Sequence, residues 1–261
     1  MMKKVTPKKS LGQHFLTDLN IAQRIADSLE LSEPTQVLEI GPGMGVLTQF
    51  LLQNPLIDLK VVELDHESVD YLLANFPNIN GRVIEADFLK LNISELFTDK
   101  FCVIGNYPYN ISSQIFFKVL DNRDSIPICS GMIQKEVAER LASKPGTKAY
   151  GILSVLLQAY YDIEYLFTVH EHVFNPPPKV KSAVIRMRRN GRTSLPCNDE
   201  LFIKVVKTAF NQRRKMMRNS LSAMVAEGVA LSEDVFMKRP EQLSVDDFID
   251  LTNLMESKIN S

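Results

Sequence analysis

The 261-residue sequence predicts an α/β fold, in which a seven-stranded, mostly parallel sheet is covered by helices and followed by a small helical domain. Two observations support this prediction. Short apolar runs alternate with helix-like patterns through the first two thirds of the chain, which is typical of a parallel sheet with helical connections. After a polar stretch over residues 190–198, the remaining sequence has a helical period and lacks strand-like runs.

Seven apolar runs are the expected strands, in chain order Val37–Ile40, Leu59–Leu64, Arg82–Ala86, Phe101–Ile104, Ile128–Ile133, Ile163–Val169 and Ser182–Met187. Helical patterns occupy the intervening segments, namely Asn20–Leu29, Gly45–Gln53, Glu67–Asn75, Ile111–Val119, Gln134–Ala142 and Gly151–Tyr160. Because the last two strands follow one another without a helix, we expect the final strand to run antiparallel. The polar stretch predicts a domain boundary near residue 193, which separates domains at 1–192 and 193–261.

The composition is that of a soluble globular protein, with 45% hydrophobic and 23% charged residues and a net charge of -1. No stretch approaches the roughly 18 apolar residues of a membrane span, and the basic N-terminus lacks the apolar segment of a secretory signal. The three cysteines form no CxxC pair, as in a reducing compartment. We therefore expect a cytoplasmic protein. The net charge hides a local excess, because residues 179–218 carry twelve Lys and Arg against two acids.

Residues 106–109 read Asn-Tyr-Pro-Tyr at the end of the fourth expected strand, an arrangement suited to methylating an exocyclic base amine. The Asn106 side-chain oxygen and the Tyr107 carbonyl could accept hydrogen bonds from the amine and direct its lone pair. Pro108 restricts the backbone, and the Tyr109 ring offers a surface on which an extruded base can stack. Taken alone, so short a pattern is equally compatible with a simple turn after a strand.

A glycine-rich turn follows the first expected strand and precedes a helix, as in nucleotide-type sites, where Gly41 and Gly43 let the backbone approach a ligand. Val46 stands where a dinucleotide fingerprint has its third glycine, which disfavours NAD. Glu63 ends the second strand, where it can accept from ribose hydroxyls, and Asp87 follows the third, where it can accept from an adenine amine. If the first and fourth strands are neighbours, these residues share one crevice with the Asn-x-Pro-Tyr segment.

With these residues in view, the chain resembles the ribosomal RNA adenine dimethyltransferases that modify two adjacent adenosines near the 3' end of small-subunit rRNA. The resemblance covers nearly the whole chain and rests on six segments, namely Lys9–Leu16, Glu39–Gly43, Asn106–Ser112, Gln134–Val137, Phe174–Val180 and Phe210–Lys215. It implies a Rossmann-like class I methyltransferase domain, S-adenosylmethionine as the cofactor, and a small helical C-terminal domain.

The resemblance also implies a set of cofactor contacts, carried by His14, Leu16, Gly41, Gly43, Glu63, Asp87 and Asn106. Two positions depart from the family pattern. His14 stands where Asn is usual, although an imidazole can also donate and accept hydrogen bonds. Tyr107 stands where Leu is usual, which is tolerable if only its carbonyl is used. Phe174 matches the aromatic residue that the family would place opposite Tyr109 to sandwich the target base.

The expected RNA contacts are basic side chains, namely Lys8, Lys9, Lys148, Lys179, Lys207, Arg213, Arg214, Lys215 and Arg218. Lys207, Arg214 and Arg218 have the spacing of one helix face. Apolar side chains share the other face of this expected helix, namely Val206, Phe210, Met217 and Leu221. The N-terminal lysines, including Lys3 and Lys4, are expected to act as a basic arm, and affinity for RNA should fall steeply with salt.

Other classes of protein are compatible with part of this pattern. A large-subunit rRNA adenine methyltransferase of the antibiotic-resistance type shares the Asn-x-Pro-Tyr layout, but residues 210–221 favour the small-subunit group. A DNA adenine methyltransferase would need a separate recognition domain, for which no length remains. A third alternative is a ribosome-assembly factor whose binding to the immature small subunit matters more than catalysis. No metal is expected, because His170 and His172 lack a third ligand, and we expect a monomer.

Overall fold

The computed structural model describes residues 5–260, so Lys3 and Lys4 of the expected basic arm lie outside the described residues. The chain divides into two compact units. The first runs to Ala138 and adds Asp162–Arg189, and the second comprises Glu139–Tyr161 and the chain from Asn190 onward. The sequence-based boundary places residues 139–161 in the first domain. In the structure this segment belongs to the same unit as the C-terminal helices.

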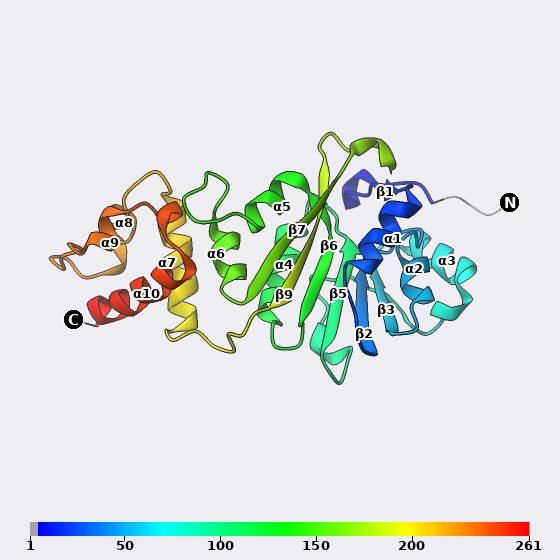
Figure 1. The fold of residues 1–261 in the computed structure, drawn as a ribbon, viewed down its shortest axis with the longest axis horizontal. Helices are drawn as coiled ribbons and strands as arrows, with labels where there is room; N and C mark the ends of the chain where they lie inside the picture. Colours follow the sequence, from blue (N-terminus) through cyan, green and yellow to red (C-terminus); the bar gives the residue numbers. More distant parts are fainter. Residues whose placement is uncertain (1–4, 261) are drawn as a thin grey trace. The chain divides into compact units, whose positions relative to one another are not determined.

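The first unit contains a seven-stranded sheet in the order β4-β3-β2-β5-β6-β9-β7 (Figure 1). Its strands are β2 Thr35–Ile40, β3 Ile57–Glu63, β4 Val83–Glu85, β5 Phe101–Asn106, β6 Ile128–Gln134, β7 Tyr161–Val169 and β9 Ser182–Arg189. All seven expected strands are confirmed, with ends displaced by no more than two residues. β2 pairs in parallel with both β3 and β5, and β9 runs antiparallel to β6, as predicted.

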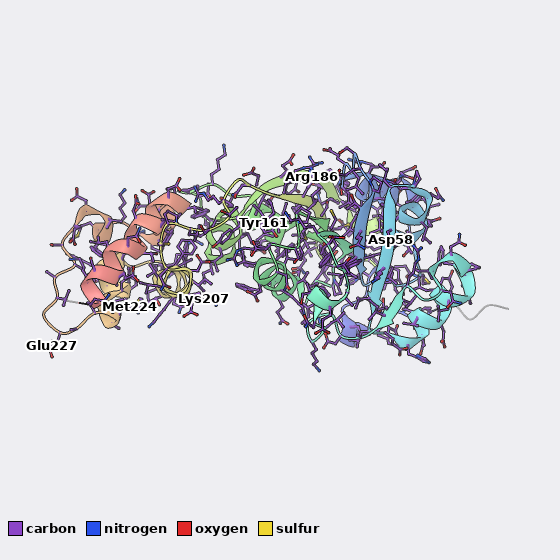
Figure 2. All side chains as sticks on the ribbon, turned by 90° about the horizontal axis from the view of Figure 1, so that it is seen from below. Asp58, Tyr161, Arg186, Lys207, Met224 and Glu227 are labelled. Atoms are coloured by element: carbon purple, nitrogen blue, oxygen red, sulfur yellow. The ribbon has the colours of Figure 1, made fainter. Side chains whose placement is uncertain are left out.

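An ion pair connects the last two strands of the sheet. Arg186 of β9 donates to both carboxylate oxygens of Glu164 on β7, with Nε–Oε1 and Nη2–Oε2 distances of 3.1 and 2.9 Å. Figure 2 labels Arg186 on its strand. Arg186 is only 7% exposed, so the pair is partly screened from water and two parallel hydrogen bonds fix its geometry.

The helices that precede α7 in the chain are α1 Leu19–Asp27, α2 Thr48–Gln53, α3 His66–Asn75, α4 Ser112–Asp121, α5 Lys135–Leu141 and α6 Ile152–Gln158. Of these, α6 belongs to the second unit. The side chain of Asp18 caps α1 by accepting from the backbone N–H groups of Asn20 and Ile21. α1 contacts both α2 and β6, and its buried residues include Ala22 and Ile25. Within residues 5–260, no helix is long and apolar enough to cross a membrane.

A second, two-stranded ladder pairs β1 (Phe15–Leu16) with β8 (Phe174–Asn175) in antiparallel register. Leu16 lies opposite Phe174, and both side chains are buried in the hydrophobic core. Just beyond the ladder, the Thr17 N–H donates to the Val173 carbonyl at 2.8 Å. Figure 1 shows β1 beside the segment that joins β7 to β9. The ladder therefore fixes the N-terminal segment against a part of the chain about 160 positions away in sequence.

The second unit contains α7 Asp199–Asn211, α8 Met217–Ser220, α9 Asp234–Met237 and α10 Val245–Ile259. Its core includes the stacked rings of Phe210 and Phe248, with centroids 5.9 Å apart. Within residues 5–260, the short 3-10 turns are Lys9–Leu11, Pro77–Ile79, Ile93–Glu95, Glu171–Val173, Ser222–Met224 and Pro240–Gln242.

The expectation of one continuous helix through Lys207 and Arg218 is wrong. α7 carries Lys207 (Figure 2) but ends at Asn211, and a turn in which the Lys215 N–H donates to the Gln212 carbonyl at 2.8 Å precedes α8. Lys207, Arg214 and Arg218 therefore do not share a single helix face. The four apolar side chains do not share one helix face either, but all are buried, namely Val206 and Phe210 in α7, Met217 in α8 and Leu221 directly after α8.

Candidate active site

A cavity of about 310 Å³ opens at the carboxyl ends of β2, β3, β4 and β5. Its walls come mainly from residues 11–16, 39–44, 62–64, 86–89 and 106–111. β2 and β5 are neighbours, which is the condition under which the predicted residues share a crevice. The cavity brings together most of the predicted site residues, namely His14, Leu16, Gly41, Gly43, Glu63, Asp87, Asn106, Tyr107, Pro108 and Tyr109.

The glycine turn after β2 has backbone angles that favour glycine. Gly41 and Gly43 have φ values of +66° and +55°. A Cβ atom at Gly43 would lie 2.9 Å from Cε1 of Phe15, so a side chain would press against the N-terminal segment that covers the turn. The Gly43 N–H donates to Oε2 of Glu63 at 3.0 Å. The turn and the end of β3 are thus held together by a carboxylate.

Glu63 is 5% exposed and accepts three backbone hydrogen bonds, from Gly43, Leu64 and Asp65. Burial raises the pKa of Glu63 above its ordinary value, while the three N–H donors oppose this shift. Asp87, at the end of β4, is less enclosed, and its Oδ1 accepts from the Leu89 N–H at 3.0 Å. Both carboxyl groups lie on the cavity wall, where they can accept hydrogen bonds from a nucleoside.

Glu39 is a cavity residue for which the sequence analysis assigned no role. It is 1% exposed, and its Oε2 accepts from Oγ1 of Thr48 at 2.7 Å. Desolvation raises the pKa of Glu39 to about 8, with a smaller contribution from the nearby Glu63. The only signal in the sequence was a glutamate inside a buried, otherwise apolar strand.

Replacing Glu39 by Gln is expected to flatten the pH dependence of stability between pH 4.5 and 8. In the folded protein Glu39 stays neutral over this range while the unfolded chain ionises, so wild-type stability falls with rising pH by at most about 1.4 kcal/mol per unit. Urea unfolding at several pH values would measure the difference. Glu33→Gln, at an exposed position, is the control, and equal slopes for wild type and Glu39→Gln would contradict the prediction.

Asn106 at the end of β5 is oriented by the N-terminal segment. Its Nδ2 donates to the carbonyl oxygen of His14 at 3.1 Å, so its Oδ1 is the atom available to accept from a substrate. Tyr107 is 1% exposed, and its hydroxyl donates to the Ser130 carbonyl at 2.7 Å. With its ring buried, Tyr107 presents only backbone to the site, which fits the predicted use of its carbonyl.

Tyr109 is half-buried, and its hydroxyl hydrogen-bonds with the hydroxyl of Ser182. Burial raises the pKa of Tyr109, so the phenol stays neutral. Its ring stacks with the imidazole of His14 at a centroid distance of 5.4 Å. Phe174 is 4% exposed, packs in the core with Leu16 and is not part of the cavity wall. The pairing of Phe174 with Tyr109 around a base stays a prediction.

The predicted RNA-contacting residues differ in their surroundings. Lys8 forms ion pairs with Asp65 and Glu67, so it fastens the N-terminal segment to the loop after β3. Arg213 is half-buried and donates to the Thr147 carbonyl at 3.2 Å. The others are exposed, namely Lys9, Lys148, Lys179, Lys207, Arg214, Lys215 and Arg218. Within residues 5–260, no group of three or more His, Cys, Asp or Glu side chains could hold a metal ion.

The family model described as ribosomal RNA adenine dimethylase matches residues 5–257. The chain belongs to this family. A relative from Parabacteroides distasonis, named ribosomal RNA small subunit methyltransferase A, is 64% identical over 99% of this chain and 97% of its own length. The protein of the same name from Bacteroides thetaiotaomicron is 61% identical over 100% and 98%.

Two solved structures resemble this adenine dimethylase. A dimethyladenosine transferase from Plasmodium falciparum superposes with a TM-score of 0.78 at 23% identity, covering 94% of this chain and 98% of that one, and supports the fold. The 23S rRNA methyltransferase ErmE superposes with a TM-score of 0.63 at 27% identity, covering 92% and 99%. The predicted Rossmann-like methyltransferase fold is confirmed.

The cofactor of this adenine dimethylase is S-adenosylmethionine, and the cavity has the chemistry to hold it. Glycine backbone at Gly41 and Gly43 leaves room for close approach, and the carboxyl groups of Glu63 and Asp87 provide acceptors for ribose hydroxyls and an adenine amine. Asn106 lies on the same cavity wall as Tyr109, three positions before it in the chain. The cavity therefore combines a nucleoside site with the residues suited to an acceptor amine.

Proposed function

We propose that this enzyme transfers methyl groups from S-adenosylmethionine to N6 of two adjacent adenosines near the 3' end of small-subunit rRNA, giving N6,N6-dimethyladenosine. The observation that carries the proposal is the identity of 58–64% with relatives that all bear the small-subunit name, over nearly their whole length. We further propose that it acts in the cytoplasm as a monomer on the immature small subunit, and so contributes to small-subunit biogenesis.

Asn106 and Tyr107 hold the acceptor amine in this mechanism. In the first transfer, Oδ1 of Asn106 and the Tyr107 carbonyl accept hydrogen bonds from the two amine hydrogens, which turns the N6 lone pair out of conjugation with the ring. The hydrogen bond from Asn106 Nδ2 to the His14 carbonyl fixes which end of the amide faces the amine. The bound S-adenosylmethionine supplies the methyl group. Once alkylated, N6 is cationic and acidic, so it can lose its proton without a strong general base.

The cofactor contacts in this proposal are Leu16, Gly41, Gly43, Glu63, Asp87 and Asn106, all of which line the cavity, together with the backbone of His14, whose carbonyl orients Asn106. Tyr109 and Phe174 serve base capture. The unit that carries the sheet is the methyltransferase domain in this proposal, and the helical unit, which includes Glu139–Tyr161 and the expected domain 193–261, serves RNA binding and assembly. The exposed basic residues contact phosphates, whereas Lys8 serves first to hold the N-terminal segment through Asp65.

Replacing Arg214 or Arg218 by Ala is expected to weaken binding to small-subunit RNA and to reduce its salt dependence. Removing one arginine–phosphate interaction lowers the slope of log K against log salt by about 1. Binding isotherms at several salt concentrations would measure both effects. Lys100→Ala removes a basic residue at an exposed position of the first unit and serves as the control. If a variant keeps the wild-type slope, the replaced arginine does not contact an RNA phosphate.

Mass spectrometry of digested nucleosides tests the proposed reaction. The protein is incubated with S-adenosylmethionine and either unmodified small-subunit particles or large-subunit rRNA. Dimethyladenosine formed only in small-subunit material is the expected result. Dimethyladenosine formed only in large-subunit rRNA would overturn the proposal in favour of the ErmE type, to which the fold is similar.

An assembly role that outweighs catalysis is a second function, which the family resemblance keeps open. A catalytically inactive Asn106 variant that still binds particles distinguishes this assembly role from a role through catalysis. If such a variant restores small-subunit maturation in cells that lack the enzyme, binding is the main contribution. If maturation requires the active protein, methylation is the main contribution.

A further inference from the structure

We propose that His14 is a positioning residue that fixes the ring of Tyr109 for stacking on the target adenine. The family resemblance assigns this position to the cofactor, whereas the geometry of the side chain points to the adenine side of the site. The inference rests on the proposed function, because it concerns how the same enzyme holds its RNA base.

His14 covers one face of Tyr109. The two rings are tilted by 25°, with centroids 5.4 Å apart. A base inserted between two parallel rings needs two contact layers of roughly 3.5 Å, or about 7 Å in total. The gap between His14 and Tyr109 is too narrow for this. The imidazole therefore backs Tyr109, and an adenine stacks on the opposite face of the ring.

The imidazole is itself held in place. Nδ1 of His14 lies 2.8 Å from the carbonyl oxygen of Pro176. Because a carbonyl oxygen can only accept, Nδ1 carries the hydrogen of this bond. The backbone carbonyl of the same residue accepts from Nδ2 of Asn106 at 3.1 Å. The side chain of His14 thus contacts the ring of Tyr109, which stacks on the base. The backbone carbonyl of His14 contacts the side-chain amide of Asn106, which holds the amine.

The segment from Phe174 to Ser182 restrains Tyr109 from two directions. Ser182 bonds directly with the Tyr109 hydroxyl, and Pro176 acts through the imidazole of His14. The β1–β8 ladder, in which Phe15 lies opposite Asn175, keeps this segment next to His14. A stacking ring fixed at its hydroxyl and along one face needs no reorganisation when the base arrives, which favours productive geometry.

A double-mutant cycle tests whether His14 acts through Tyr109. The variants are His14→Ala, Tyr109→Ala and the combination, with His14→Phe as the conservative replacement that keeps a ring. kcat/KM for methyl transfer is measured with unmodified small-subunit particles, and affinity for S-adenosylhomocysteine is measured by calorimetry. His170→Ala removes an exposed histidine outside the cavity wall and is the matched control.

We expect His14→Ala to lower kcat/KM about three- to tenfold, the effect of removing one aromatic pair, and His14→Phe to recover part of that activity. The double variant should be no slower than Tyr109→Ala, and affinity for S-adenosylhomocysteine should stay within about twofold. Retained affinity also shows that the variant is folded.

Two results would overturn the inference. The first is a double variant whose decrease in kcat/KM equals the product of the decreases in the two alanine variants, which would show that His14 acts independently of Tyr109. A fall in cofactor affinity that matches the decrease in kcat/KM would make His14 a cofactor contact instead. Failure of the proposed function is distinguishable from both, because the unmodified enzyme would then produce no dimethyladenosine in small-subunit particles.

Discussion

Replacing Asn106 by Ala is expected to reduce the rate of methyl transfer by about a hundredfold to a thousandfold. This is the usual cost of removing one preorganised polar group from a reaction centre. The change deletes the Oδ1 acceptor for the amine and the Nδ2 donor to the His14 carbonyl. Much of the cofactor affinity should remain, because the glycine turn and the buried carboxylate of Glu63 are untouched. Single-turnover transfer and calorimetry measure the two quantities separately.

Asn122→Ala is the matched control for this experiment. Asn122 follows α4, and its Nδ2 also donates to a backbone carbonyl, that of Lys118, at 2.8 Å. Its replacement should leave transfer unchanged, because Asn122 is not part of the cavity wall. Near-normal turnover of Asn106→Ala would refute the assigned role of Asn106.

Replacing Gly131 by Ala is expected to destabilise the sheet by about 3 kcal/mol or more. Gly131 in β6 has a φ of +152°, and an added Cβ would collide with the Gly105 carbonyl oxygen and lie 2.7 Å from Cε2 of Tyr107. Backbone strain and overpacking each cost roughly 1 to 3 kcal/mol. The clash involves the two residues on either side of Asn106, so transfer should fall together with stability.

Denaturant unfolding monitored by circular dichroism measures this decrease in stability. Gly191→Ala is the control, because Gly191 has an ordinary φ and no atom within 4 Å of an added Cβ. The two variants add the same methyl group, so their difference isolates the effect of the crowded position. An equally small effect at both positions would show that the sheet can relax around Gly131.

The sequence was sufficient to predict the middle of the sheet because β5 Phe101–Asn106 and β6 Ile128–Gln134 are long apolar runs buried on both faces. The location of the cavity followed from the same pattern. Gly43, Glu63 and Asp87 each follow or end a parallel strand, and parallel strands bring their carboxyl ends to one edge. These inferences used only local sequence and the rules of parallel sheets.

Long-range side-chain contacts could not be predicted in the same way. The two-residue strands Phe15–Leu16 and Phe174–Asn175 are too short to have a period, so their pairing left no signal. Lys8 resembled a free RNA-binding lysine because Asp65 is distant in sequence. The spacing of Lys207 and Arg218 fitted a helix, but the polar segment around Gln212 forms a turn instead.

The β1–β8 ladder imposes an order on how the enzyme is made. Residues 12–16, which emerge early from the ribosome, line the cofactor cavity but find their pairing partner only at Phe174 and Asn175. A nascent chain that has not yet extended past Pro176 lacks the strand that secures this wall and the carbonyl that holds His14. A growing chain therefore completes its cofactor cavity only after Pro176 has been synthesised, long after the cavity residues at positions 12–16.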